Sequence, residues 1–179
     1  LPTDTPTEVP TDTPTPTPDV EATEQALAAQ QADALIADKI APELEKLGLS
    51  VEDGDLAWSS TDTDTIRIFD YNTYDFIPMG DDLTVQDFVL YTDVTWESTG
   101  GYAICGLIYR AESEITKGEY YLFQSIRLSG FPGWDIEFWD GKQSGISVSG
   151  GVQSNRSIDQ GQGSTNSYML VIQGDKMTA

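Results

Sequence analysis

Gln86–Trp96 reads QDFVLYTDVTW, and its side chains alternate in a way that decides the fold class. In an extended strand, successive side chains point to opposite faces, so every second residue shares a face. One face of this stretch then carries Phe88, Leu90, Thr92, Val94 and Trp96. Val89, Tyr91, Asp93 and Thr95 lie on the other face. The pattern predicts a β-strand with one mainly apolar face.

Further strand patterns follow at short intervals, separated by Gly-rich turn signals. The stronger candidates are Tyr102–Arg110, Tyr120–Leu128 and Trp134–Trp139. The weaker ones are Leu56–Ser59, Thr65–Phe69, Ile146–Ser149 and Tyr168–Gln173. Turns are expected at Ser98–Gly101, Ser129–Gly133 and Asp140–Gly141. Many short strands with almost no helix predict a mainly β chain built as a β-sandwich.

Composition divides the chain into three zones. Residues 1–20 hold six of the nine prolines, alternating with Thr, and predict a disordered, extended stalk. Residues 21–50 carry apolar residues at helical spacing and predict a helical spacer. Pro42 should break or kink it, giving one helix to about Ile40 and a short second helix over 42–47. Residues 51–179 are predicted to form the β-sandwich, incomplete at the C-terminus.

Charge and residue usage exclude several functions. Nine Lys and Arg against 30 Asp and Glu give a net charge of −21, which argues against nucleic acid as a partner. The chain has no His, so the usual zinc sites and Ser-His-Asp triads cannot form. A single Cys allows no intrachain disulfide. No apolar run is long enough to span a membrane.

Acidity and the Thr/Pro stalk together favour an extracellular or cell-surface location. The sequence starts at Leu1 rather than Met, which leaves open a signal peptide or anchor removed upstream, or a fragment.

Three segments in order resemble a known superfamily: DFVLYTDVTW at Asp87–Trp96, CGLIYR at Cys105–Arg110 and LVIQGDKMT at Leu170–Thr178. Over about residues 55–179 the chain resembles concanavalin A-like lectins and glucanases, and most closely laminin-G-like modules of secreted or surface-anchored bacterial proteins. The resemblance implies a jelly-roll β-sandwich. In such modules one or two further strands close the sandwich. We therefore expect the C-terminal strands to be missing, which would leave an open edge.

The most informative stretch for function is WDIEFWD at Trp134–Asp140. Alternation places Asp135, Glu137 and Trp139 on one face. Carboxylates beside an indole suit sugars, because sugar CH groups stack on the ring and hydroxyls donate to the acids. We predict a non-catalytic carbohydrate-binding module acting through the concave sheet. The predicted ligand-binding residues are Asp135, Glu137, Trp139, Tyr121, Arg127 and Arg110.

Two other functions stay open. Asp135, Glu137 and Asp140 reproduce the spacing of the E-I-D-x-x-E run of laminarinase-type glycosidases, but with Asp and Glu exchanged. An Asp nucleophile would sit too far back for retaining hydrolysis, so a glycoside hydrolase is disfavoured and no catalytic residue is assigned. The other alternative is a structural or adhesion module that binds a surface protein. The two arginines have an ordinary reading as ion-pair partners of Glu137 or Asp135.

No cofactor is assigned, and calcium is the only metal that the residues could hold. Candidate acidic loops are Asp53–Asp55, Asp62–Asp64 and Asp81–Asp82, although short Asp clusters more often form turns. Calcium is sometimes bound at the sandwich rim of laminin-G-like relatives. Cys105 lies among apolar residues and is expected to be a buried apolar side chain rather than a nucleophile.

Overall fold

The computed structural model comprises two compact units, residues 1–81 and 82–179, which are described separately here. It describes residues 20–60, 62–68, 75–79, 83–97, 101–115, 117–141 and 145–179. The predicted stalk therefore lies almost entirely outside the described residues.

The first unit contains the expected helical segment, which changes character just before Pro42 and continues as a short second helix, as predicted. α1 (Val20–Leu35) runs through a π-helical turn (Ile36–Ile40) into α2 (Ala41–Lys46). The Ala41 N–H bonds to the Ile36 carbonyl, an i→i+5 bond that widens the helix just before the proline. Pro42 then occupies the first turn of α2, where a missing N–H costs little. The regular α-helix is thus interrupted before Pro42 by a π-turn.

Among the described residues of the first unit, one more short helix follows α2. Val51–Asp53 is a 3-10 turn capped by Ser50, whose hydroxyl accepts from the Glu52 N–H. The weak strand prediction for Leu56–Ser59 is wrong, and Thr65–Ile68 forms no strand either. Phe69 lies outside the described residues. Alternation alone did not suffice in these segments, because a strand also needs a neighbour to pair with.

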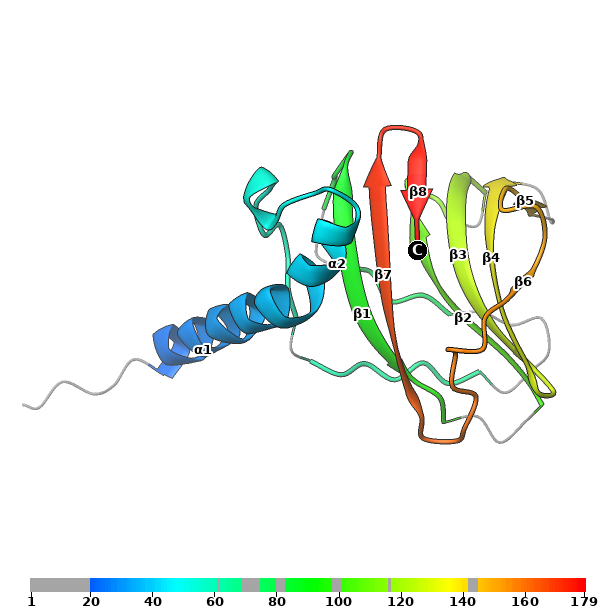
Figure 1. Ribbon diagram of the computed structural model, residues 1–179, viewed down its shortest axis with the longest axis horizontal. Helices are drawn as coiled ribbons and strands as arrows, with labels where there is room; N and C mark the ends of the chain where they lie inside the picture. Colours follow the sequence, from blue (N-terminus) through cyan, green and yellow to red (C-terminus); the bar gives the residue numbers. More distant parts are fainter. Residues whose placement is uncertain are drawn as a thin grey trace, which may run out of the picture. The chain divides into compact units, whose positions relative to one another are not determined.

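The second unit is mainly β, with eight strands in two antiparallel sheets (Figure 1). Sheet A has the order β1 (Phe88–Thr95), β7 (Thr165–Gln173), β8 (Lys176–Thr178). Sheet B has the order β2 (Tyr102–Tyr109), β3 (Glu119–Leu128), β4 (Phe131–Asp140), β5 (Ile146–Ser147), with β6 (Gln153–Ser154) also paired to β4. The strong strand predictions are confirmed, as is the strand expected near Tyr168–Gln173.

A two-residue turn sets the register of β3 and β4. Ser129 and Gly130 have φ of 43° and 89°, and two-residue hairpin turns favour such positive values because their twist matches that of the strands. The turn was expected to extend to Gly133, but Phe131 already pairs with Leu128. The resulting register places Tyr121 opposite Phe138 and Tyr120 opposite Trp139.

The two sheets face one another across aromatic and aliphatic side chains. The Tyr168 ring lies 5.7 Å from the Phe123 ring, and its hydroxyl donates to Ser125 Oγ at 2.7 Å. Phe88 of sheet A meets Tyr109 of sheet B edge-on at 6.2 Å. Leu170 and Ile172 of β7 are 0% and 1% exposed. The core of the unit therefore lies between the sheets, a sandwich-like arrangement.

Hydrogen bonds tie the sheets together at the β7–β8 turn. Arg110 Nη2 donates to the Gly174 carbonyl at 2.5 Å, and the Gly174 N–H donates to Asp87 Oδ1 at 2.8 Å. The Tyr109 hydroxyl donates to Met177 Sδ at 2.7 Å. Burial, together with the nearby Tyr121, raises the pKa of Tyr109 to about 12 despite the opposing effect of Arg110. This hydroxyl therefore stays protonated and able to donate well above neutral pH.

The Tyr168–Ser125 bond should contribute measurably to stability because Ser125 is 0% exposed. We expect Tyr168→Phe and Ser125→Ala each to lower the free energy of unfolding by about 1–2 kcal/mol, since each leaves a buried hydroxyl unpaired. The double variant should lose less than the sum. Denaturant unfolding measures all three. Tyr91→Phe, which removes an exposed bond to Asp93, is the control and should change stability by under about 0.5 kcal/mol. Additive losses would contradict a direct bond between the sheets.

Candidate functional site

The alternation predicted for the WDIEFWD stretch is confirmed in β4. Phe138 contacts Tyr121, whose ring stacks on Tyr109 in the space facing sheet A. Trp139 instead contacts Tyr120 and Glu137 on the opposite, outer face of sheet B. Asp135 shares this outer face, because it lies two residues from Glu137 along the strand. The predicted trio Asp135, Glu137 and Trp139 thus lies on one face.

Asp135 is nevertheless not presented to solvent. It is 3% exposed, and its Oδ1 accepts hydrogen bonds from Ser147 Oγ at 2.8 Å and from Ser149 Oγ. The Ser147 hydroxyl in turn accepts from the Gly151 N–H at 2.7 Å. These bonds fold the segment after β5 back over β4. A buried carboxylate holding two serines is part of the architecture, and a ligand could reach it only if this segment moved.

Glu137 and Trp139 form a partly exposed cluster with Tyr120. Trp139 Nε1 donates to Glu137 Oε2 at 2.9 Å. The Tyr120 and Trp139 rings are nearly parallel, with centroids 5.8 Å apart and planes at 7°. Gly145 packs against the indole edge, where a Cβ would come within 2.7 Å of Cε2. We call these three side chains the Glu137–Trp139–Tyr120 cluster.

Tyr120 is not among the ligand-binding residues predicted from the sequence, although the hairpin turn could have indicated it. A two-residue turn at Ser129–Gly130 fixes the pairing of Tyr120 with Trp139. A five-residue turn, Ser129–Gly133, was predicted from the sequence and gives a different strand register, and Tyr121 rather than Tyr120 was predicted as a binding residue.

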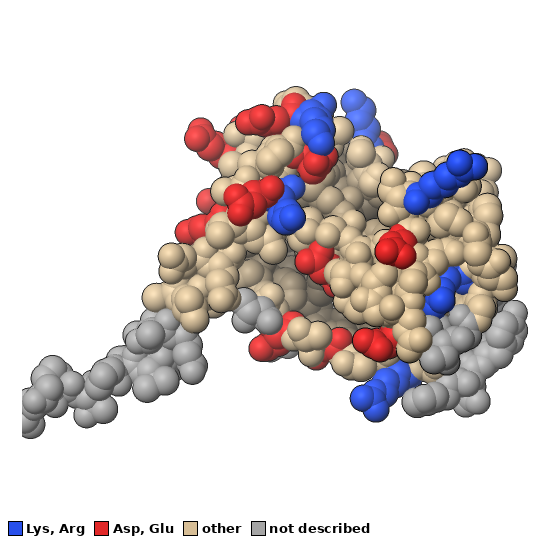
Figure 2. Space-filling view, turned by 60° about the horizontal axis from the view of Figure 1, so that its bottom comes forward, with Lys and Arg blue, Asp and Glu red and all other residues tan. Residues whose placement is uncertain are grey.

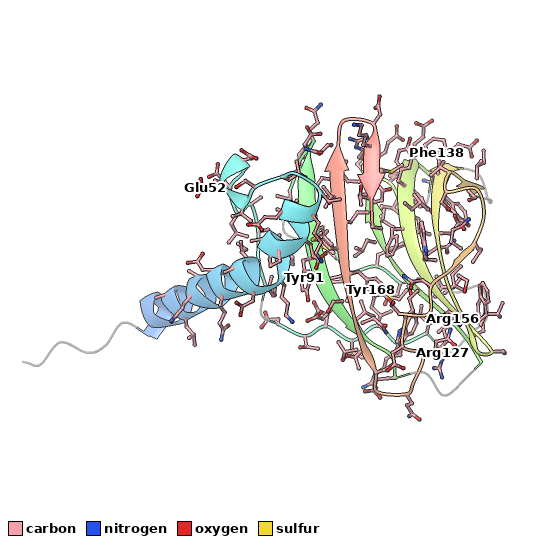
Figure 3. All side chains as sticks on the ribbon, in the orientation of Figure 1. Glu52, Tyr91, Arg127, Phe138, Arg156 and Tyr168 are labelled. Carbon is pink, nitrogen blue, oxygen red and sulfur yellow. The ribbon has the colours of Figure 1, made fainter. Side chains whose placement is uncertain are left out.

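The other three predicted residues are not brought to this cluster. Tyr121 lies on the inner face, where its ring stacks on Tyr109 at 5.7 Å. Arg127 lies six residues further along β3, roughly 20 Å away at strand spacing. Figure 3 shows Arg127 and Phe138, the partner of Tyr121, at opposite ends of sheet B. Arg110 donates to the Gly174 carbonyl rather than to Glu137 or Asp135.

The acidic spacing that resembled a glycosidase does not give an exposed acid pair, because Asp135, which shares a face with Glu137, is buried. Asp135 bonds Ser147 and Ser149, and Glu137 bonds the Trp139 indole. Asp140 is three residues from Glu137 along β4, so the two carboxylates start on opposite faces of the strand. Retaining hydrolysis needs two carboxyl groups about 5–5.5 Å apart across the substrate. Geometry therefore gives this reading no support.

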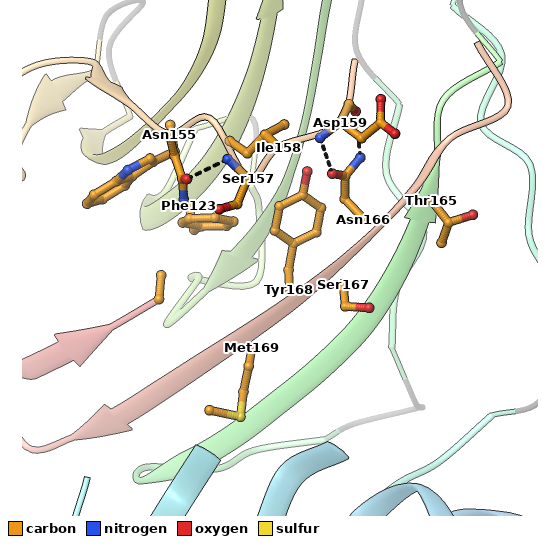
Figure 4. Close-up of a pocket in the computed structure, with 12 residues that line it drawn as sticks. Phe123, Asn155, Ser157, Ile158, Asp159, Thr165, Asn166, Ser167, Tyr168 and Met169 are labelled. Atoms are coloured by element: carbon orange, nitrogen blue, oxygen red, sulfur yellow. Dashed lines mark hydrogen bonds between the residues drawn. The ribbon is translucent and has the colours of Figure 1, made fainter. Parts of the chain in front are cut away.

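A cavity of about 280 Å³ lies between the sheets at one side (Figure 4). Sheet B contributes Phe123 and Trp134, and the loop after β6 contributes Asn155, Ser157, Ile158 and Asp159. β7 contributes Thr165, Asn166, Ser167, Tyr168 and Met169, and Ala179 completes the lining. The cavity thus combines three aromatic rings with hydroxyl, amide and carboxylate groups.

Hydrogen bonds hold the loop that lines this cavity. Asn166, which is 7% exposed, accepts the Asp159 N–H at 2.8 Å and donates to the Asp159 carbonyl at 2.9 Å. Asn155 Oδ1 accepts the Ser157 N–H at 2.9 Å. No local sequence pattern indicates this site, because its residues come from β3, β4, β7, the loop after β6 and Ala179, which only the fold brings together.

The structure can be compared with the predictions for calcium and for the Cys105 thiol. Across the described ranges, no three Asp, Glu or Cys side chains gather closely enough to hold a metal ion. Asp53 of one candidate loop accepts the Ser50 N–H at 3.2 Å, and Asp81–Asp82 lies outside the described residues. Cys105 was predicted to be buried but is half-buried. Its partial burial raises the pKa of the thiol, which favours the protonated form.

On the face shown in Figure 2, acidic side chains are scattered among wide areas of other residues. Within the described residues, no helix is long and apolar enough to cross a membrane.

No protein-family model, curated protein or solved structure matches the chain.

The buried Asp135 should act on stability rather than on ligand contact. We expect Asp135→Ala to lower the free energy of unfolding by about 2–4 kcal/mol, because two serine hydroxyls lose their acceptor inside the fold. Amide exchange over residues 147–151 should become faster in the same variant. Glu137→Ala is the control on the same face and should cost under about 1 kcal/mol. Equal losses in the two variants would contradict the assignment.

Proposed function

We propose that this chain contains an extracellular, non-catalytic carbohydrate-binding module with a concanavalin A-like jelly-roll fold. Two facing antiparallel sheets support the fold proposal, together with the motif order in the sequence. The acidic composition and the Thr/Pro stretch support the location. The laminin-G-like resemblance supports the ligand class.

The Glu137–Trp139–Tyr120 cluster is the observation that carries the ligand proposal. Its indole and phenol rings are stacked on one another, and an aromatic ring that is not fully buried suits the CH face of a sugar. The Trp139 Nε1–H is bonded to Glu137 Oε2, which fixes both side chains before a ligand arrives. The Glu137 carboxylate would act as the acceptor for sugar hydroxyls. A prepaired platform loses little side-chain entropy on binding.

A protein-binding or adhesion role is the second candidate. A glycoside hydrolase is not proposed, because Asp135 is buried and the remaining acids point to opposite faces.

A glycan array tests the carbohydrate proposal directly. We expect Trp139→Ala to weaken binding to the best glycan by about tenfold or more, since buried aromatic anchors carry most of the energy in such contacts. Trp58→Ala is the matched control: it removes a tryptophan that is 43% exposed in the other unit, and it should leave binding unchanged. Circular dichroism confirms that each variant is folded.

Two results would count against the proposal. One is unchanged glycan binding in folded Trp139→Ala, which would move the site elsewhere. The other is the absence of any glycan signal from folded wild-type protein, which would favour the protein-binding role.

A further inference from the structure

The charged side chains on the outer face of sheet B are all acidic over β2, β3 and β4. The register of these three strands places alternate residues on that face, and among those residues only Asp135 and Glu137 are charged. Arg127 is the one base in the three strands, and it belongs to the opposite set. That set includes Ser125, which bonds Tyr168 of the facing sheet. A ligand on the outer face therefore meets negative charge.

The buried Asp135 adds to the negative charge at the cluster. It lies two residues from Glu137 along β4, roughly 7 Å away. Its Oδ1 accepts from the Ser147 and Ser149 hydroxyls, which are neutral donors and do not cancel its charge. Because it is buried, water screens its charge less than that of an exposed carboxylate. Its charge therefore acts on a ligand that does not touch it.

Glu137 is the acid of this face that a ligand can reach. It is half-buried, and Trp139 Nε1 donates to its Oε2 at 2.9 Å. This bond holds the carboxylate beside the indole, so a sugar stacked on the ring brings one of its substituents to the carboxylate. Lys117, in the loop before β3, pairs with Glu114 at 2.9 Å. The substituent that meets Glu137 therefore decides which sugars fit.

We propose that the Glu137–Trp139–Tyr120 cluster selects sugars that carry a protonated primary amine, an inference that rests on the carbohydrate-binding function proposed above. An ammonium group donates a hydrogen bond to Glu137 as a hydroxyl does, and it adds an opposite charge. N-acetylation removes that charge. A uronic acid would instead place a carboxylate against two like charges, which costs affinity. The ligand class is therefore an unacetylated amino sugar, such as β-1,4-linked glucosamine.

Oligosaccharides with one backbone and different groups at C2 test this selection by isothermal titration calorimetry. The β-1,4-linked oligomers of glucose, N-acetylglucosamine and glucosamine carry a hydroxyl, an acetamido and an ammonium group there. At about pH 5.5 the amine is protonated and exposed carboxylates are ionised. We expect the glucosamine oligomer to bind at least about fivefold more tightly than the other two. An oligomer of β-1,4-linked glucuronic acid should bind most weakly.

Two variants separate the local charge from the overall charge of the chain, which is −21. Glu137→Gln keeps the size of the side chain, and it should reduce the preference for glucosamine over glucose oligomers to about twofold or less. Asp175→Asn changes the net charge equally at an exposed residue of the β7–β8 turn, and it should keep the full preference. Circular dichroism checks that both variants are folded.

Tetralysine tests the other source of the same chemistry, because it carries amines without a sugar ring. It should compete with the glucosamine oligomer at least about tenfold less well than unlabelled oligomer does, since it cannot stack a sugar face on Trp139. Competition as strong as that of the oligomer would assign the site to lysine-bearing peptides and overturn the proposal.

The remaining outcomes distinguish this proposal from the one on which it rests. Equal affinities of the glucose, N-acetylglucosamine and glucosamine oligomers would overturn amine selection and leave carbohydrate binding in place. Loss of the preference in Asp175→Asn as well as in Glu137→Gln would show that overall charge is responsible, which also overturns it. The absence of any glycan binding by folded wild-type protein would overturn both proposals.

Discussion

The antiparallel ladder between β1 and β7 is the constraint on which the rest of the second unit depends. It pairs Phe88 with Ile172 and Thr95 with Thr165, residues that are far apart in the sequence. Side chains reinforce it at intervals, through the Thr95–Thr165 hydroxyl contact at 2.7 Å and the Ser167 bond to Asp93. Without this ladder, sheet A has no central strand. Closing so long a loop is entropically costly, so the ladder must be held by the core that it helps to form.

Two consequences follow from the position of β7. Its even-numbered side chains face sheet B, which buries Leu170 and Ile172 and brings Tyr168 to Ser125. The backbone N–H and C=O groups of its odd-numbered residues bond to β8 only near the turn. Beside the cavity, no described strand pairs with this edge of β7. The same strand therefore supplies core packing on one face and unused bonding capacity along one edge. The carbohydrate proposal depends on neither, because its cluster lies on the outer face of sheet B.

Local patterns in the sequence predicted the strands but not the partners of individual side chains. Alternation correctly placed β1, β2, β3 and β4, and it separated Trp139 from Phe138. It failed at Leu56–Ser59, where no neighbouring strand pairs. Asp135 was predicted to be accessible to a ligand because alternation alone cannot show what packs over a strand face. In the structure, the segment that contains Ser147 and Ser149 packs over Asp135 and hydrogen-bonds to it. The cavity could not be predicted, since Trp134, Asp159 and Tyr168 meet only through the tertiary fold.

Residue-resolved amide exchange by NMR tests the half-paired state of β7 most directly. Asn166, Tyr168 and Leu170 point toward β1, and their amides should exchange slowly, at rates set by opening of the ladder. The amides of Ser167 and Met169 point to the open edge and should exchange at least about tenfold faster than those neighbours. Alternating protection along one strand is the result that this account requires. Uniformly slow exchange from Asn166 to Leu170 would contradict it, because the second edge of β7 would then already be bonded.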